Sequence, residues 1–230
     1  MEFFMKEVID EEWGNYFDLT PAGYMMLVAI MIVLLLGACL VSGWKAGSKK
    51  RIFSARQLAF CAMAMALAFV TSLIKIIDMP MGGAVTLFSM MFICLTGYWY
   101  GLRVGLLTAV AYGFLQLISN PYIISIPQML TDYILAFGAL GLSGLFAGKK
   151  HGLVMGYLVG VTGRFVFTFL SGMIFFGSYA SAYHMAAPLY SFCYNGAYLG
   201  LEALISVLIL SLPPVRQGLA RVKEMAAGKM

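Results

Sequence analysis

Charged residues are what this sequence lacks most. Lys, Arg, Asp and Glu make up 11% of its 230 residues, whereas soluble domains carry about 25%. Hydrophobic residues make up 62% of the chain. A soluble core of this size could not hide that much apolar surface, so the sequence predicts that a lipid bilayer is the solvent.

Several motifs of catalysis and metal binding are also missing. The chain has two histidines and no HExxH pattern. Its four cysteines (Cys39, Cys61, Cys94 and Cys193) lie inside apolar runs without CxxC spacing, which indicates small buried side chains, not disulfides or metal ligands. No GxxxxGK[ST] loop is present to hold ATP phosphates. We therefore expect a protein that is not an enzyme and carries no cofactor or metal.

Long apolar runs are what the chain does have. They cover about 22–43, 57–77, 83–100, 104–119, 129–148, 152–175 and 189–212. Most reach the roughly 17–25 residues that a spanning helix needs, although the fourth run is short and ends at Asn120-Pro121. The pattern predicts an all-α membrane protein with one compact helical domain.

Basic residues fall between these runs and indicate the orientation of the chain. They are Lys45, Lys49, Lys50, Arg51, Arg56, Arg103, Lys149, Lys150, Arg216, Arg221, Lys223 and Lys229. If all seven runs cross, every cluster lies on one side, which is expected to be the cytoplasm. Residues 1–21, with six acidic side chains against Lys6, are then outside. This predicts a multi-pass protein of the bacterial plasma membrane with its C-terminus in the cytoplasm.

Some ionisable residues lie within the apolar runs or close to their ends. Arg164 and Glu202 reach similar depths, about 8 Å apart at 1.5 Å of helix rise per residue. A structural ion pair between them is favoured over a contact with a substrate. Lys75 and Asp78 are close enough to a helix end to reach the interface.

The stretch "PLYSFCYNGAYLGLE", residues 188–202, places Tyr190, Tyr194 and Asn195 on one helical face. Asp132 begins the fifth apolar run without a basic residue nearby in sequence. An interfacial aromatic belt would explain the tyrosines, but it explains neither the asparagine nor the aspartate. The combination predicts a pocket for a flat, cationic, hydrogen-bonding ligand.

Three stretches resemble one family. Along the chain these are "TDYILAFGALGLSGLF", "GRFVFTFLSGMIFFGSYA" and "LYSFCYNGAYLGLE". They are similar to motifs that occur in the same order in the thiamine-specific S components of energy-coupling factor (ECF) transporters. The resemblance covers about residues 55–212. It implies a six-helix substrate-binding core, residues 51–215, followed by a basic cytoplasmic tail, residues 216–230. Residues 1–50 would add an acidic extracellular N-terminus, one extra transmembrane helix and a basic loop.

The resemblance also implies a function. In that family the S component binds thiamine with high affinity near the outer face and delivers it to a shared module, which consists of a transmembrane T component and two ATPase subunits. A different reading stays open, in which the chain is a stand-alone ion-coupled carrier for a small cationic or aromatic metabolite. Arg164 and Glu202 would then relay protons.

Family motifs assign roles to individual residues. Asp132, beside Tyr133, matches the acidic ligand of the aminopyrimidine, and Tyr190 and Asn195 match positions that contact the polar groups of the vitamin. The remaining matches are Tyr122 in a closing loop, Gly172 where the pocket wall approaches closely, and Thr168 and Phe176 where the family has histidine and tryptophan. No tryptophan occurs in residues 75–84, where the family has a lid aromatic. These departures leave both thiamine and a precursor, such as an aminopyrimidine alcohol, as candidate ligands.

A second motif concerns the partner. "LAFCAMAMALAF" contains Ala62, Ala64, Ala66 and Ala68, which form two small-xxx-small pairs of the kind that allow helices to pack closely in lipid. The family uses an AxxxA pattern on this helix against the T component. These four alanines are therefore the predicted docking residues.

Overall fold

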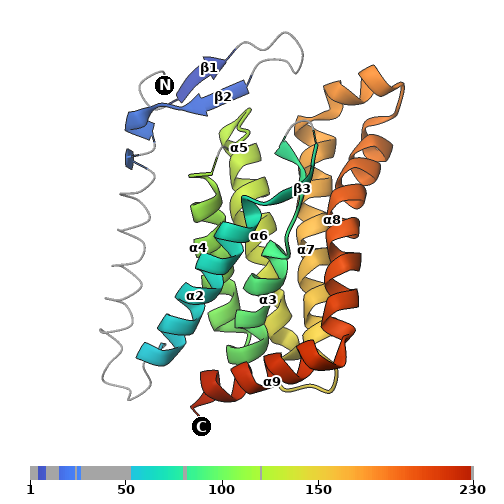
Figure 1. Ribbon diagram of the computed structural model, residues 1–230. Helices are drawn as coiled ribbons and strands as arrows, with labels where there is room; N and C mark the ends of the chain where they lie inside the picture. Colours follow the sequence, from blue (N-terminus) through green and yellow to red (C-terminus); the bar gives the residue numbers. More distant parts are fainter. Residues whose placement is uncertain are drawn as a thin grey trace.

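The computed structural model describes residues 5–8, 16–23, 25–26, 53–79, 82–119 and 121–228. Over this part of the chain the molecule is a bundle of helices that run roughly side by side, with short strands near one end (Figure 1). The predicted first span, Cys39 and the basic residues from Lys45 to Arg51 lie almost wholly outside the described residues. The extra helix and the 1–50 segment therefore stay predictions.

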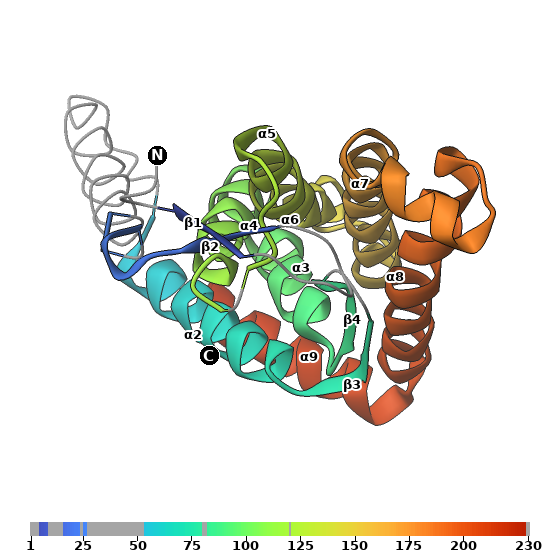
Figure 2. The same ribbon diagram turned by 90° about the horizontal axis from the view of Figure 1, so that it is seen from above.

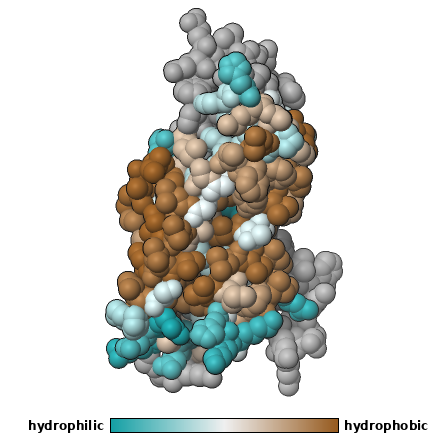
Figure 3. Space-filling view, turned by 90° about the vertical axis from the view of Figure 1, so that its right-hand side faces the viewer, coloured by the Kyte–Doolittle hydropathy of each residue, from teal (hydrophilic) through white to brown (hydrophobic). Residues whose placement is uncertain are grey.

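Among the described residues, four helical stretches are long and apolar enough to cross a membrane: α2 (Ala55–Ser72), the continuous run Ile126–Phe146, α7 (Gly152–Phe175) and α8 (Ala187–Ser211). Two shorter helices, α3 (Ser89–Tyr100) and α4 (Leu102–Gln116), stand among them. The side of the molecule toward α7 and α8 shows a mostly hydrophobic band above a hydrophilic end (Figure 3). The prediction of an all-α membrane protein is confirmed.

The third predicted span, 83–100, is wrong as a single helix. Only Ser89–Tyr100 is helical, and Ala84–Thr86 forms strand β4. Strand β3 (Lys75–Asp78) pairs with it in antiparallel fashion, so the second predicted span also ends early, at Ser72. The apolar character of this segment does not distinguish helix from strand, but Gly82, with φ of 87°, supplies the backbone turn that a hairpin needs.

The acidic N-terminal stretch contains a second hairpin. Strand β1 (Met5–Val8) pairs antiparallel with β2 (Tyr16–Leu19). These strands were not predicted from the sequence, because they lie outside the long apolar runs that indicate spanning helices.

The run Ile126–Phe146 changes its winding along its length. It begins as α5 (Ile126–Met129), continues as a π-helical turn, η2 (Leu130–Leu135), and passes through α6 (Ala136–Gly138) into a 3₁₀ stretch, η3 (Ala139–Phe146). π-Helical turns are rare and are frequently found at functional sites. This one contains Asp132.

Glycines bring the helices together at the end of the bundle where α3 and α4 meet. A Cβ atom on Gly105 would lie 2.7 Å from the Cα atom of Gly97 and 2.9 Å from the carbonyl oxygen of Gly141. A Cβ atom on Gly141 would lie 2.5 Å from the Cα atom of Leu106. Helices α3, α4 and η3 therefore pack backbone against backbone, as small residues permit in membrane bundles.

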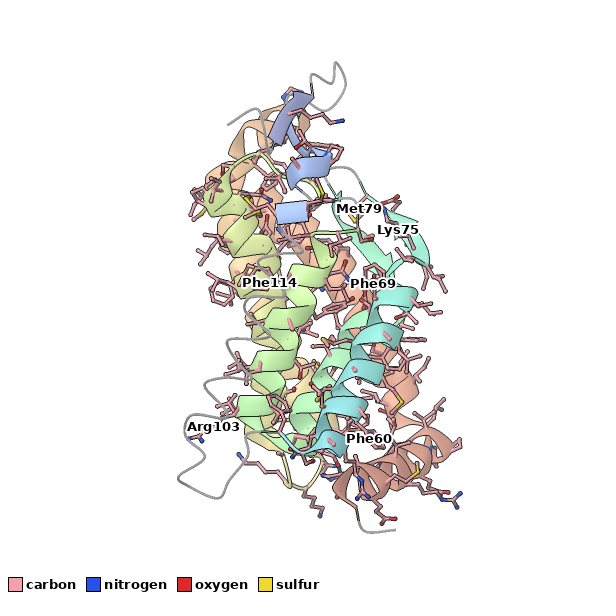
Figure 4. All side chains as sticks on the ribbon, turned by 90° about the vertical axis from the view of Figure 1, so that its left-hand side faces the viewer. Phe60, Phe69, Lys75, Met79, Arg103 and Phe114 are labelled. Atoms are coloured by element: carbon pink, nitrogen blue, oxygen red, sulfur yellow. The ribbon has the colours of Figure 1, made fainter. Side chains whose placement is uncertain are left out.

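The last helix, α9 (Pro213–Ala227), lies across this same end of the bundle (Figures 1 and 2). Lys223 Nζ lies 3.8 Å from the centre of the Tyr98 ring, and the Tyr100 hydroxyl donates to the carbonyl oxygen of Ala226 at 3.3 Å. Much of the predicted tail, residues 216–230, therefore belongs to a helix. Arg103 lies at this end too, opposite Lys75 and Met79 (Figure 4).

Candidate functional site

A cavity of about 820 Å³ lies in the part of the bundle that the β3–β4 hairpin closes. Ligand pockets typically have volumes of roughly 300–1,000 Å³. All eight residues that the sequence predicted for the site line this cavity: Tyr122, Asp132, Tyr133, Thr168, Gly172, Phe176, Tyr190 and Asn195. The tertiary structure thus brings together side chains from four separate parts of the chain.

Helix α7 gives the cavity one regular wall. Arg164, Thr168, Gly172 and Phe176 all line it, and their spacing of four residues keeps them on one helical face. At 1.5 Å per residue this row extends over about 18 Å. The predicted helix 152–175 has the bounds of α7 itself.

Helix α8 gives a second wall with the same spacing. Tyr190, Tyr194, Tyr198 and Glu202 follow one another every four residues and line the cavity. Their rings are in contact: the Tyr190 and Tyr194 centroids are 5.9 Å apart and stacked, and those of Tyr194 and Tyr198 are 5.7 Å apart and edge-on. The cavity therefore has an aromatic side that ends at a carboxylate.

Asp132 receives its hydrogen bond from its own helix. Gln128 Nε2 donates to Asp132 Oδ2 at 2.7 Å, and Gln128 is 1% exposed. Oδ1 accepts no hydrogen bond from the described residues. Gln128 was not among the residues predicted from the sequence, although its position four residues before Asp132 places both side chains on one helical face.

Near Tyr122, the cavity wall is aromatic and consists of tyrosines and Phe176. The backbone N–H of Tyr122 donates to the Tyr133 hydroxyl at 2.9 Å, and the Tyr122 and Tyr179 hydroxyls are 2.9 Å apart. The Phe176 ring lies 6.0 Å from the Tyr122 ring and 6.0 Å from the Tyr179 ring. Tyr179, which was not predicted from the sequence, does not line the cavity itself but contacts both of these lining residues.

Asn195 uses its amide mainly within the protein. Its Nδ2 donates to the carbonyl oxygens of Thr168 at 3.2 Å and Ser191 at 3.0 Å, and its Oδ1 accepts from the Tyr198 hydroxyl at 3.0 Å. The side chain therefore ties α8 to α7. A second lone pair on Oδ1 is the capacity left for a ligand.

Gly172 and Thr168 also serve the contact between these two helices. A Cβ atom on Gly172 would lie 2.2 Å from Ser191 Oγ, so only glycine permits this approach. The Thr168 hydroxyl donates to carbonyl oxygens of its own helix, at Arg164 (3.2 Å) and Phe165 (3.1 Å).

The predicted ion pair between Arg164 and Glu202 is wrong. Among the described residues the two groups form no salt bridge; instead the Arg164 guanidinium lies 4.0 Å from the centre of the Phe137 ring. Glu202 accepts hydrogen bonds from the backbone N–H groups of Thr86 and Met90 at 3.0 and 3.3 Å. Similar depth along two helices did not imply contact, because the Glu202 carboxylate accepts its hydrogen bonds from a third segment instead.

The cavity wall carries an excess of negative charge. Lys75 and Asp78 form an ion pair with each other, with Nζ and Oδ2 3.0 Å apart. Among the described lining residues, the remaining carboxylates and basic groups belong to Asp132, Glu202 and Arg164, so two formal negative charges stand against one formal positive charge. A ligand with one positive charge would balance the site.

The four alanines of the predicted docking surface divide into two pairs. Ala64 and Ala68 are buried within the chain, at 3% and 0% exposure, and Ala68 O accepts from the Tyr112 hydroxyl. Ala62 and Ala66 are not covered by the rest of the described chain. A docking surface on α2 can therefore include the second pair, whereas the first pair packs internally.

Two comparisons with known proteins identify the family of the chain. The model of the thiamine transporter protein family (Thia_YuaJ) matches residues 58–220. The thiamine transporter ThiT of Bacillus subtilis (strain 168) is 33% identical over 152 residues, which cover 59% of this chain and 77% of that protein. Because the family model covers most of the chain, including every helix that lines the cavity, the chain belongs to the thiamine transporter family.

Proposed function

We propose that the chain takes part in thiamine uptake by binding thiamine with high affinity in the cavity. The observation that carries this proposal is the placement of Asp132 in an aromatic cavity with one excess negative charge. Thiamine has a flat aminopyrimidine, a thiazolium ring with a permanent positive charge and a hydroxyethyl tail. These three parts match a carboxylate acceptor, aromatic faces and polar side chains.

Asp132 is the proposed acceptor for the aminopyrimidine. Gln128 fixes the carboxylate by donating to Oδ2 at 2.7 Å, so Oδ1 is available to accept from the exocyclic amine. A hydrogen bond to a charged group contributes about 1.5–3 kcal/mol. The residue would therefore provide both orientation and a large part of the affinity.

The thiazolium ring is proposed to lie against the aromatic wall. Phe176 and Tyr190 line the cavity from α7 and α8, and the face of an aromatic ring attracts a cation within about 6 Å of its centre. Phenylalanine is a weaker partner than tryptophan in this respect. The tyrosines of α8 add ring surface that compensates for the smaller Phe176.

The charge balance favours thiamine over a neutral precursor. An aminopyrimidine alcohol would satisfy Asp132 but would leave the excess negative charge of the wall without a counter-ion. Desolvating an unpaired charge is costly, so the neutral compound should bind more weakly than thiamine. A phosphorylated thiamine would bring additional negative charge to a wall that already has an excess of it, so it should also bind more weakly than thiamine.

We further propose that the chain works as the substrate-binding component of an ECF transporter and docks on a T component through α2. Ala62 and Ala66 are one helical turn apart on the uncovered face of α2, where close helix approach is possible. A stand-alone carrier with an Arg164–Glu202 proton relay is disfavoured, because Glu202 is held by Thr86 and Met90 and does not contact Arg164.

Isothermal titration calorimetry on the purified full chain tests the binding step, with thiamine and an aminopyrimidine alcohol as ligands. Thiamine should bind tightly without turnover, and the alcohol should bind at least about ten-fold more weakly if one charged contact is lost. Equal affinities would contradict the charge argument. Uptake of labelled thiamine by cells with and without the T component and ATPase subunits tests the coupling, which should depend on both.

A further inference from the structure

Glu202 is buried, at 3% exposure, on the cavity face of α8. Its Oε2 accepts from the backbone N–H of Thr86 at 3.0 Å and from the Thr86 hydroxyl at 2.8 Å. Its Oε1 accepts from the Met90 N–H at 3.3 Å. The Ser89 hydroxyl lies 3.5 Å from Oε1 and 2.6 Å from the Thr86 hydroxyl, so it completes the network through Thr86. All these groups belong to the end of strand β4 and the start of helix α3.

This segment has no cap of its own. Phe88 precedes α3 in a left-handed conformation, with φ of 62°, and makes no side-chain hydrogen bond to the helix. The first N–H groups of a helix need partners from outside it, and a negative charge near them is favourable. Glu202 supplies both from a helix that is more than 100 residues away in sequence.

The same hairpin is attached to α8 a second time. The Gly83 N–H donates to the Tyr194 hydroxyl at 3.0 Å, and a Cβ atom on Gly83 would lie 2.4 Å from that oxygen. Tyr194 and Glu202 are eight residues apart, about 12 Å along the helix axis. Hairpin residues between these two contacts, including Ala84, line the cavity.

We infer that Glu202 is a positioning residue, which seats the β3–β4 hairpin against α8 and thereby sets the cavity wall opposite Asp132. It acts through Thr86 and the start of α3. Its carboxylate is occupied by these donors and makes no direct contact with the ligand, although its charge still belongs to the overall charge of the cavity wall. The expected effect of Glu202 on thiamine binding rests on the proposed function, whereas its role in holding the hairpin against α8 does not.

Hydrogen–deuterium exchange on the ligand-free full chain tests the positioning role directly. Glu202→Gln keeps the shape of the side chain but replaces one carboxylate oxygen with an N–H₂ group, which cannot accept a hydrogen bond from the donors that faced that oxygen. Amides of residues 75–86 should then exchange about ten-fold faster, as expected for the loss of one charged hydrogen bond. Ser206→Ala is the matched control, because Ser206 is buried one turn further along α8 without contacting the hairpin. Unchanged exchange in Glu202→Gln would overturn the inference.

Thr86→Val provides a second test that does not disturb α8. It removes the hydroxyl donor and should accelerate exchange of the hairpin and release of thiamine, measured by stopped-flow fluorescence. The double variant Glu202→Gln/Thr86→Val should show less than the sum of the two effects, since both changes break one contact. Additive effects would overturn the positioning role. If the unmodified chain does not bind thiamine, the proposed function fails, while the exchange comparison still decides the role of Glu202.

Discussion

The two ends of the bundle use small and polar residues in different ways. Near α9, glycines at positions 97, 105 and 141 press backbones together and leave no room for a side chain. Around the β3–β4 hairpin, the helices line a cavity of about 820 Å³. A rigid close-packed end thus supports an end that is open enough to hold a small molecule.

Two carboxylates of the cavity wall show the same contrast on a smaller scale. Among the described residues, Glu202 accepts hydrogen bonds from the Thr86 N–H, the Thr86 hydroxyl and the Met90 N–H, whereas Asp132 accepts one, from Gln128. A carboxylate whose donors are complete stabilises the fold. A carboxylate with an unused oxygen in a cavity is available for a ligand.

The largest effect should come from filling the close-packed end. Gly105→Ala places a methyl group 2.7 Å from the Cα atom of Gly97, and overpacking costs typically about 1–3 kcal/mol, or more when backbones must move. We expect loss of most folded protein, seen by size-exclusion chromatography in detergent. Gly200→Ala is the control, because nothing lies within 4 Å of its Cβ position; equal loss in both variants would contradict the packing argument.

Docking should be the next most sensitive property. Ala66→Leu adds bulk to the uncovered face of α2, so thiamine uptake should be lost while thiamine binding stays normal. Ala64→Leu, on the buried face, should instead reduce the thermal stability of the isolated chain. Co-purification with the T component measures the first effect. Recovery of the Ala66→Leu complex at normal yield would show that this face does not dock.

Removing the charge at Asp132 should weaken binding by about ten-fold to over a hundred-fold, which corresponds to roughly 1.5–3 kcal/mol. Titration calorimetry of Asp132→Asn with thiamine measures this loss. Asp78→Asn is the control, since Asp78 is exposed and paired with Lys75. Matching affinities for Asp132→Asn and the unmodified chain would remove Asp132 from the site.

Asn195→Leu should have a mixed effect. It breaks the bonds to Thr168 and Ser191 and leaves the Tyr198 hydroxyl without its acceptor. Unsatisfied buried groups cost about 1–3 kcal/mol, so both thermal stability and thiamine affinity should fall. Tyr190→Phe, which keeps the ring, should lose less affinity. A more stable Asn195→Leu protein would favour a lipid-facing position instead.

The smallest effect, a gain, is expected for Phe176→Trp. The indole is a better cation–π partner than the phenyl ring, by roughly 0.5–1 kcal/mol or somewhat more when desolvated. Thiamine should bind slightly more tightly and quench the introduced fluorescence. An unquenched indole would place the thiazolium ring away from Phe176.

Composition and periodicity were sufficient for much of this protein. The long apolar runs predicted the membrane class and the bounds of α7, because a helix in lipid must satisfy its backbone hydrogen bonds internally. Spacing of four residues predicted that Tyr190 and Tyr194 share a face. Local patterns of this kind depend only on the geometry of a single helix.

Tertiary structure decided the partners of the polar groups. The sequence paired Arg164 with Glu202 by depth alone, but the structure brings Thr86 and Met90 to Glu202 and Phe137 to Arg164. It also shows which alanine pair of α2 faces inward, which no small-xxx-small pattern can specify. Long-range contacts depend on how helices rotate about their axes and where the chain leaves helical geometry, and these are set by the packing of the whole bundle.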